Sequence, residues 1–414
     1  MKTSNSPLAN RGAHCDTVTI LKRFVPGALA LLAGLGSAHS EPRVVTLEGD
    51  LVAGLVESIS PEGIVGMGDK QWPLDGLRSI VPAEPSGVED TSDGRVVLIC
   101  GSEIAASGIK VIEEEVVFQV PGLGEWKLPI DAVRALRFGQ LQRGSRFQKG
   151  LLEWEAARDF DTIFISGGAE LQEVDGLIEE LDEAALTFER EGEQNLQTIP
   201  KVRVYGAVLA SPLLQDDERP DCVLALAGGT RLRGDIRELK DGKVILDLVE
   251  GVEMAVPWAS VRRVGIRSPR LAYLSDLEPS GTDTRPIIAP LRAPQRDRTV
   301  AGLPIRIGDQ TYDKGLGFAA GTQMTFDNDD SYDLFLAEIG IDVDARGRGD
   351  CEFVVAAGEK ELLRKRVRGG EAPLLIKVDI GGAAQITLRV DPGEDLDIAD
   401  HADWADACFL QRLK

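Results

Sequence analysis

Residues 128–136 (LPIDAVRAL) contain the pattern on which the fold prediction rests. Three residues separate Pro129 from Val133, and Arg134 and Leu136 complete the motif. Proline cannot donate a hydrogen bond to a β-ladder, so it favours turns and the ends of strands. The alternation of apolar and polar residues after the turn is typical of a half-buried strand. The motif therefore predicts a tight turn followed by a short strand.

The same motif recurs at three other places, which indicates an internal repeat. It spans Trp72–Ile80 in the first copy and Val256–Val264 in the fourth, whereas the third copy, Ile199–Val204, reads as two residues shorter. Before each motif, short alternating runs are separated by glycines, as expected for four or five short strands joined by turns. Residues 44–268 are therefore predicted to form four small β units, which vaguely resemble small Sm-like barrels.

The spacing of the motif prolines suggests how these units are grouped. Pro73 and Pro129 are 56 residues apart, Pro200 and Pro257 are 57 apart, and 71 separate the middle two. A small barrel has little surface to bury, so neighbouring units should pack in pairs. We expect a first pair over 41–140 and a second pair over 161–268. The extra residues between them predict a connecting helix over 141–160, because Phe147, Leu151, Leu152 and Ala156 would share one face.

The last third of the chain, residues 269–414, alternates without any strong helix candidate. About eight strands over this length predict an all-β jelly roll or sandwich. The Pro-rich stretch 278–298 is interpreted as a long loop inside this domain. The predicted strands are Leu303–Ile307, Gln323–Phe326, Leu334–Ile341, Glu352–Ala356, Leu374–Val378, Gln385–Val390 and Ala407–Leu410.

Four pieces of this third resemble the NPCBM family, carbohydrate-binding modules attached to glycoside hydrolases. They are Tyr273–Leu277 (YLSDL), Tyr312–Gly317 (YDKGLG), Ile339–Asp342 (IGID) and Asp400–Ala407 (DHADWADA). The resemblance implies a galactose-binding-like jelly roll that recognises glycans, with galactose-type sugars as the implied class. Two positions depart from the family: Pro279 stands where the family has a tryptophan, and Ala319 where it has a histidine.

Sugar recognition needs a flat apolar face and rigid polar partners for the hydroxyl groups. The family pieces supply both, and residues 400–406 would bring a tryptophan, a histidine and carboxylates together on one loop. In the alternative interpretation Trp404 belongs to the core, the carboxylates fix turns, and Lys314 is solvated in a hairpin. The candidate carbohydrate-binding residues are Asp276, Tyr312, Lys314, Asp400, His401, Asp403 and Trp404.

An acidic run between Asp391 and Asp406 raises the question of a metal. Calcium takes six to eight oxygen ligands, which a dense acidic loop can offer, so a structural calcium ion is one expectation. The spacing does not match an EF-hand loop, and the other expectation is a solvated acidic rim. No other cofactor is expected.

The N-terminus has the pattern of a secretory signal peptide over residues 1–40. Lys22 and Arg23 precede an apolar stretch, Phe24–Leu35, and small residues stand before Glu41. The apolar stretch is shorter than the roughly 20 residues that span a bilayer, although an uncleaved anchor is the alternative. We therefore expect a secreted, periplasmic or cell-surface protein without a membrane span after cleavage.

The formal net charge of −22 argues against nucleic acid as a partner, because such binding needs clustered Lys and Arg. Beyond the predicted signal peptide the chain has four cysteines: Cys100, Cys222, Cys351 and Cys408. An oxidising compartment permits disulfides, with Cys351 and Cys408 as the favoured pair, and buried thiols are the alternative.

Enzyme functions find little support in the sequence. His401 is the only histidine after residue 40, and the sequence has no G-x-S-x-G elbow and no phosphate-binding loop. The prediction is an exported, non-catalytic protein that binds a glycan or glycoconjugate. The alternative is a structural or protein-interaction scaffold whose module has lost sugar binding, with a cryptic glycosidase as a distant third. The protein partner of the repeats is not predicted.

Overall fold

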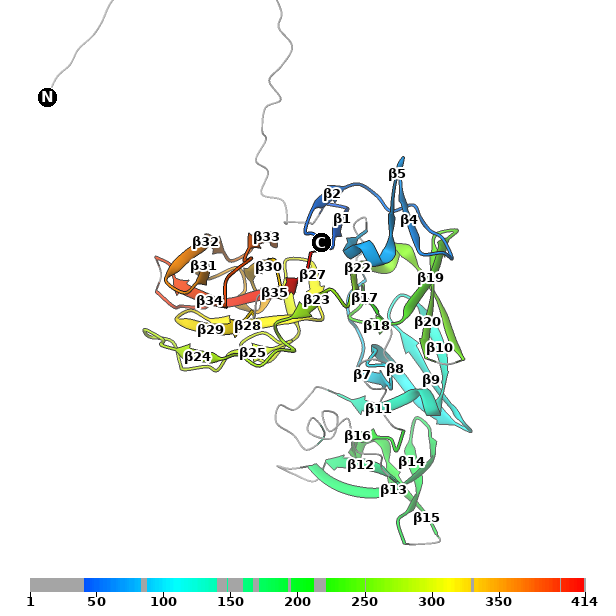
Figure 1. The fold of residues 1–414 in the computed structure, drawn as a ribbon. Coiled ribbons are helices and arrows are strands. Elements are labelled where there is room, and N and C mark those ends of the chain that lie inside the picture. The colour runs from blue at the N-terminus through cyan, green and yellow to red at the C-terminus, as the bar shows by residue number, and fades with distance from the viewer. Residues whose placement is uncertain are drawn as a thin grey trace, which may run out of the picture. The chain divides into compact units, whose positions relative to one another are not determined.

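The structure is a computed structural model that describes residues 41–82, 88–139, 147, 159–166, 171–192, 195–211, 221–249, 251–328, 331–394 and 396–412. The predicted signal peptide lies outside these residues, and so does the predicted connecting helix apart from Phe147, Asp159 and Phe160. The described part of the chain is built from β-strands and short 3-10 turns, which confirms the all-β prediction (Figure 1). No helix in it is both long and apolar enough to cross a membrane.

The four predicted β units are present, and each is a meander of strands whose last strand follows a 3-10 turn. Unit 1 consists of β1 (Arg43–Thr46), β2 (Leu51–Ala53), β3 (Ser58–Ile59), β4 (Ile64–Met67), β5 (Lys70–Pro73), η1 (Leu74–Gly76) and β6 (Leu77–Val81). Unit 2 consists of β7 (Gly94–Leu98), β8 (Glu103–Ile112), β9 (Glu115–Val120), β10 (Gly124–Pro129), η2 (Ile130–Ala132) and β11 (Val133–Phe138).

The other two units repeat this order of elements. Unit 3 consists of β12 (Asp161–Ser166), β13 (Leu171–Leu181), β14 (Ala185–Arg190), β15 (Leu196–Pro200), η3 (Lys201–Arg203) and β16 (Val204–Val208). Unit 4 consists of β17 (Cys222–Leu226), β18 (Arg231–Arg233), β19 (Asp235–Lys240), β20 (Lys243–Val249), β21 (Val252–Pro257), η4 (Trp258–Ser260) and β22 (Val261–Ile266).

The motif prolines occupy one structural position in all four units, directly before the 3-10 turn. In unit 3 the closing strand begins at Val204, so this copy has the same length as the others and not two residues fewer. Tyr205 therefore stands where the other units have arginine. The sequence analysis aligned Arg203 with the arginines of the other units, because it gave more weight to the arginine than to the number of residues in the turn.

The strand pairing of the units is nested and differs from the predicted one. Unit 2 pairs with unit 3 through β11 and β16, and again through β8 and β13. Unit 1 pairs with unit 4 in the same two ways, through β6 with β22 and β3 with β19. A single antiparallel bridge between β8 and β18 joins the two pairs. Proline spacing reports the length of each unit's hairpins, and it carries no information about which strand edges meet.

The last third forms the predicted two-layer sandwich. One sheet has the order β25-β28-β35-β30-β33, with β23 beside β35, and the other has the order β24-β29-β34-β31-β32. The first sheet comprises β23 (Leu271–Tyr273), β25 (Gln295–Arg296), β28 (Gly315–Ala319), β30 (Leu334–Ile341), β33 (Leu374–Asp379) and β35 (His401–Leu410). The second comprises β24 (Gly281–Thr284), β29 (Thr322–Asp327), β31 (Asp350–Ala357), β32 (Lys360–Arg368) and β34 (Gln385–Pro392).

A small hairpin, β26 (Ile305–Ile307) and β27 (Gln310–Tyr312), packs on the outer face of the first sheet. Gly340 of β30 permits this approach, because a Cβ there would lie only 2.2 Å from Ile307 Cγ2. A 3-10 turn, η5 (Val343–Ala345), follows β30. The outer face of this sheet is therefore covered, which buries the polar side chains on it.

The strand predictions in the sandwich were incomplete. The sequence analysis did not predict β23, β24, β25, β27, β28 or β32. Of these, β32 (KELLRKRVR) buries little more than Val367 and pairs its arginines with neighbouring carboxylates. The last strand begins at His401 rather than Ala407, so residues 401–406 are part of β35 and not of a loop. The four cysteines of the described residues are buried and no disulfide joins them, contrary to the favoured Cys351–Cys408 pair.

Candidate functional site

His401 lies at the start of β35, where it joins two other polar side chains. Its Nδ1 is 2.6 Å from Asp344 Oδ1, and its Nε2 is 3.4 Å from Arg292 Nη1. In the tautomer that satisfies both contacts, Nδ1–H donates to Asp344 and Nε2 accepts an N–H of Arg292. Burial alone would raise the pKa of Asp344, but the bond from His401 and the nearby Arg292 charge hold it below its ordinary value. All three side chains of this trio stay partly exposed.

Apolar side chains border the trio on neighbouring loops. Both carboxylate oxygens of Asp397 accept hydrogen bonds from backbone N–H groups of residues 287–289, at 2.6–3.2 Å, and so tie two loops together. We call this region the His401 end of the sandwich, comprising residues 287–292, 343–344 and 396–401. Its exposed apolar side chains are Ile287, Ile288, Leu291, Val343, Leu396 and Ile398.

Trp404 and Asp403, both predicted to contact sugar, are completely buried. The indole of Trp404 packs edge-on against Phe318, Phe335 and Phe353 between the two sheets. Asp403 points to the opposite face of β35, towards Asp342. Burial, and then the neighbouring Asp342 carboxylate, raise the pKa of Asp403 well above its ordinary value, which favours its protonated form.

The remaining predicted residues are spread over three other places. Asp400 is buried, and its Oδ1 accepts the backbone N–H of Asp350 at 2.8 Å. Lys314 is bonded to Asp276 and lies 3.0 Å from Asp297 Oδ2, in a separate cluster. Tyr312 is buried, and its hydroxyl donates to Glu338 at 3.0 Å. The structure therefore does not bring the predicted residues into one site.

Sequence reasoning missed two members of the trio, Arg292 and Asp344. Asp344 stands two residues after the IGID piece, which is a signal that could have pointed to it. Arg292 lies in the Pro-rich loop, and only its contact with His401 reveals it. Among the described residues, no group of three or more His, Cys, Asp or Glu side chains could hold a metal ion. A structural calcium ion remains a prediction.

A second polar cluster lies where the sandwich contacts units 1 and 4. Glu338 is the only charged residue in the apolar strand β30. Its carboxylate accepts hydrogen bonds from Arg263 Nη2 at 2.8 Å and from Arg43 Nη2 at 3.2 Å. Burial would raise the pKa of Glu338, but Arg263, Arg43 and Arg78 lower it to about 2. The carboxylate is therefore fully charged at neutral pH although it is buried. The sequence signal for it was the single acidic residue in β30.

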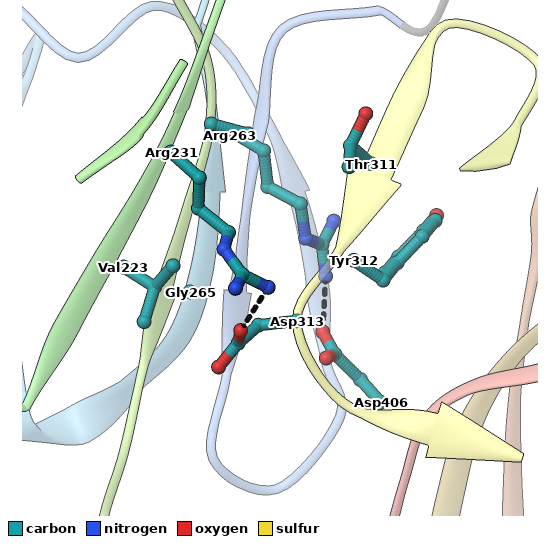
Figure 2. Close-up of a pocket in the computed structure, with 9 residues that line it drawn as sticks. Val223, Arg231, Arg263, Gly265, Thr311, Tyr312, Asp313 and Asp406 are labelled. Atoms are coloured by element: carbon teal, nitrogen blue, oxygen red, sulfur yellow. Dashed lines mark hydrogen bonds and ion pairs between the residues drawn. The ribbon is translucent and has the colours of Figure 1, made fainter. Parts of the chain in front are cut away.

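Figure 2 shows a small pocket at the same interface, lined by residues of unit 4 on one side and of the sandwich on the other. Arg263 Nη2 lies 2.6 Å from Asp406 Oδ2, and Arg231 Nη1 lies 2.6 Å from Asp313 Oδ1. The guanidinium of Arg263 also lies 4.4 Å from the centre of the Tyr312 ring. Because these charged groups pair with one another, the pocket is interpreted as part of a structural interface.

The interface should make the stability of the chain depend on acid pH. Since the folded pKa of Glu338, about 2, lies below its ordinary value near 4.5, its charge stabilises the fold above pH 4.5. That contribution is lost as the pH falls from 4.5 towards 2. We expect the melting temperature of the wild type to fall more steeply over this range than that of Glu338→Gln, which lacks the titrating group. Parallel melting curves, followed by circular dichroism, would contradict the assignment.

Several solved structures of CBM51 modules are similar to this chain. The structure of CBM51-2 with GlcNAc and INT domains from Clostridium perfringens ZmpB is 22% identical over 41% of this chain and 36% of that chain, with a TM-score of 0.32. CBM51 from Clostridium perfringens GH95 with methyl-galactose is 26% identical over 34% of this chain and 99% of that chain, with a TM-score of 0.31. The tandem CBM51 modules of Sp3GH98, a family 98 glycoside hydrolase from Streptococcus pneumoniae SP3-BS71, are 13% identical over 90% of this chain and 89% of that chain, with a TM-score of 0.31.

No curated protein matches the chain. The family model of the NPCBM/NEW2 domain, in contrast, matches residues 270–410, which are nearly the whole sandwich. The boundaries of the match enclose all four sequence pieces that carried the resemblance. Residues 270–410 of this chain are therefore an NPCBM/NEW2 domain.

Proposed function

We propose that this chain is an exported, non-catalytic protein that binds a glycan at the His401 end of its NPCBM/NEW2 domain. The observation that carries the proposal is the partly exposed trio of His401, Asp344 and Arg292 beside apolar surface. A guanidinium has five N–H donors, more than its bond to His401 uses, so Arg292 can also bind hydroxyl groups. Export rests on the signal-peptide pattern of residues 1–40.

The register of the sheet supports this location. Ala319, which stands where the family carries a histidine, is the ladder partner of His401. The family position and the trio therefore share one end of the sandwich. In this proposal Asp403 and Trp404 act from behind the site, because they fix the strand that presents His401. Galactose-type glycans are proposed as the ligand class.

We expect Arg292→Ala and His401→Ala to weaken glycan binding by about tenfold to a hundredfold, since losing a charged hydrogen bond costs about 1.5–3 kcal/mol. Binding of the full-length chain to a glycan array, and of methyl-galactose and GlcNAc by calorimetry, would measure this. Arg296→Ala is the matched control, because its exposed pair with Glu278 lies on the same domain away from the trio.

Two outcomes would contradict the proposal. One is a wild-type chain that binds no glycan on the array, and the other is binding that both trio variants leave unchanged. The first would favour a scaffold in which the domain has lost sugar binding. That second function is supported by the interface around Glu338, which holds the domain on units 1 and 4.

A further inference from the structure

The bridge between units 2 and 4 joins two structurally equivalent strands. In each of these units the first two strands form a hairpin, and the first residues of the second strand pair with the first strand. Glu103 of unit 2 pairs with Val97, and Arg231 of unit 4 pairs with Ala225. Glu103 and Arg231 also face each other across the bridge, with Arg231 Nη2 3.1 Å from Glu103 Oε1. Because equivalent residues face each other, the contact has local twofold symmetry.

Two further hydrogen bonds follow the same symmetry. The backbone N–H of Arg233 donates to Ser102 Oγ at 2.8 Å, and that of Ala105 donates to Thr230 Oγ1 at 3.1 Å. In both directions a short polar side chain, one residue before the bridge, accepts from the opposite strand. This contact shows how two units of this kind associate through their second strands.

Unit 1 has the same elements at the same positions. Leu51 is the equivalent of Glu103, because it pairs with Val45 and Val45 in turn pairs with Ser79 of the closing strand. Asp50 precedes it as the short polar residue. Gly54 N–H bonds back to Pro42 O within the unit, so the N–H of Ala53, one residue earlier, points to the other side of β2.

Strand β2 has no charged residue at any of its three positions. Strand β2 is the last in its sheet, and Leu51 and Leu55 are each 52% exposed. Natural edge strands commonly carry charges that prevent pairing with another chain. Unit 3 has Glu173 at the equivalent position, which follows this rule, whereas unit 1 has an exposed leucine.

We propose that β2 binds β2 of a second copy of this chain, with Leu51 facing its own counterpart on a twofold axis. A charged residue at such a position would repel itself, while leucine would bury apolar surface. The N–H of Ala53 would donate to the Asp50 carboxylate of the other copy, as Arg233 donates to Ser102. Pairing of β2 with unit 3 of another copy would instead place Leu51 against Glu173.

Sedimentation velocity of the full-length chain between roughly 1 and 100 μM tests the proposal. A dimer is expected in this range because the pairing of two β2 strands also buries two leucine side chains, and dimers form as the concentration rises. Leu51→Glu and Leu51→Arg should each give monomers. A mixture of these two variants should form a heterodimer, because it recreates the Glu103–Arg231 pair. Leu196→Glu, at a residue 62% exposed in unit 3, is the matched control and should remain dimeric.

A wild type that stays monomeric at the highest concentration would overturn the proposal, as would Leu51 variants that still dimerise. Failure of the mixture to form a heterodimer would overturn the twofold pairing at Leu51. Circular dichroism of each variant establishes folding, which an exposed substitution should leave intact.

Discussion

Replacing Glu338 with alanine is expected to lower the free energy of unfolding of the full-length chain by about 3–5 kcal/mol. The carboxylate is buried and receives Arg43, Arg263 and the Tyr312 hydroxyl. Its removal leaves the buried guanidinium groups of Arg43 and Arg263 without the negative charge that balances them. A buried charge without its partner is costly. Urea unfolding followed by circular dichroism would measure the loss.

Glu253→Ala is the matched control for this result. Glu253 also pairs with an arginine, Arg237, but both side chains are 53% exposed. Exposed ion pairs contribute at most about 1 kcal/mol, so the control should unfold almost like the wild type. If the two variants lost equal stability, the interface around Glu338 would not hold the domain on units 1 and 4.

Trp404→Ala is expected to cost a similar amount, about 3–5 kcal/mol, because it leaves a large cavity between the sheets. The indole has no exposed surface and contacts three phenylalanine rings. Thermal unfolding should therefore shift strongly, and any loss of glycan binding should accompany the loss of structure. Trp404→Phe, which keeps an aromatic ring in the core, should be less destabilised.

The opposite result would be informative. A Trp404→Ala variant that keeps the wild-type unfolding midpoint but no longer binds glycan would show that the indole contacts the ligand directly. Measuring both properties on the same preparation separates the two roles.

The local fold could be predicted from the sequence because its signals are local. The Pro-x-x-x motif placed the 3-10 turns, and an almost continuous apolar run placed β30 at the residues where it occurs, Leu334–Ile341. The strand β32 could not be found in this way, because a surface strand rich in lysine and arginine has no apolar alternation. The pairing of the units could not be predicted either, because strand partners such as Ile80 and Val264 are distant in the chain.

The candidate site was predicted less well, for reasons that particular residues illustrate. Residues 400–406 are polar in sequence, which suggested a loop, yet 401–406 belong to β35. Asp403 and Asp406 are buried there, and Asp406 pairs with Arg263 of unit 4. His401 remains partly exposed because it is the first residue of that strand. Its partners Arg292 and Asp344 come from other loops, and only the fold brings them together.

The nested order of the units favours one sequence of folding events. Leu136 and Ala207, partners in the inner pair, are 71 residues apart, whereas Ile80 and Val264 of the outer pair are 184 apart. Closing the longer loop from an unfolded chain costs roughly 0.8 kcal/mol more in entropy. If units 2 and 3 fold first, they shorten the effective loop between units 1 and 4. The inner pair would thus form early, and the outer pair, with the domain that rests on it, would be completed last.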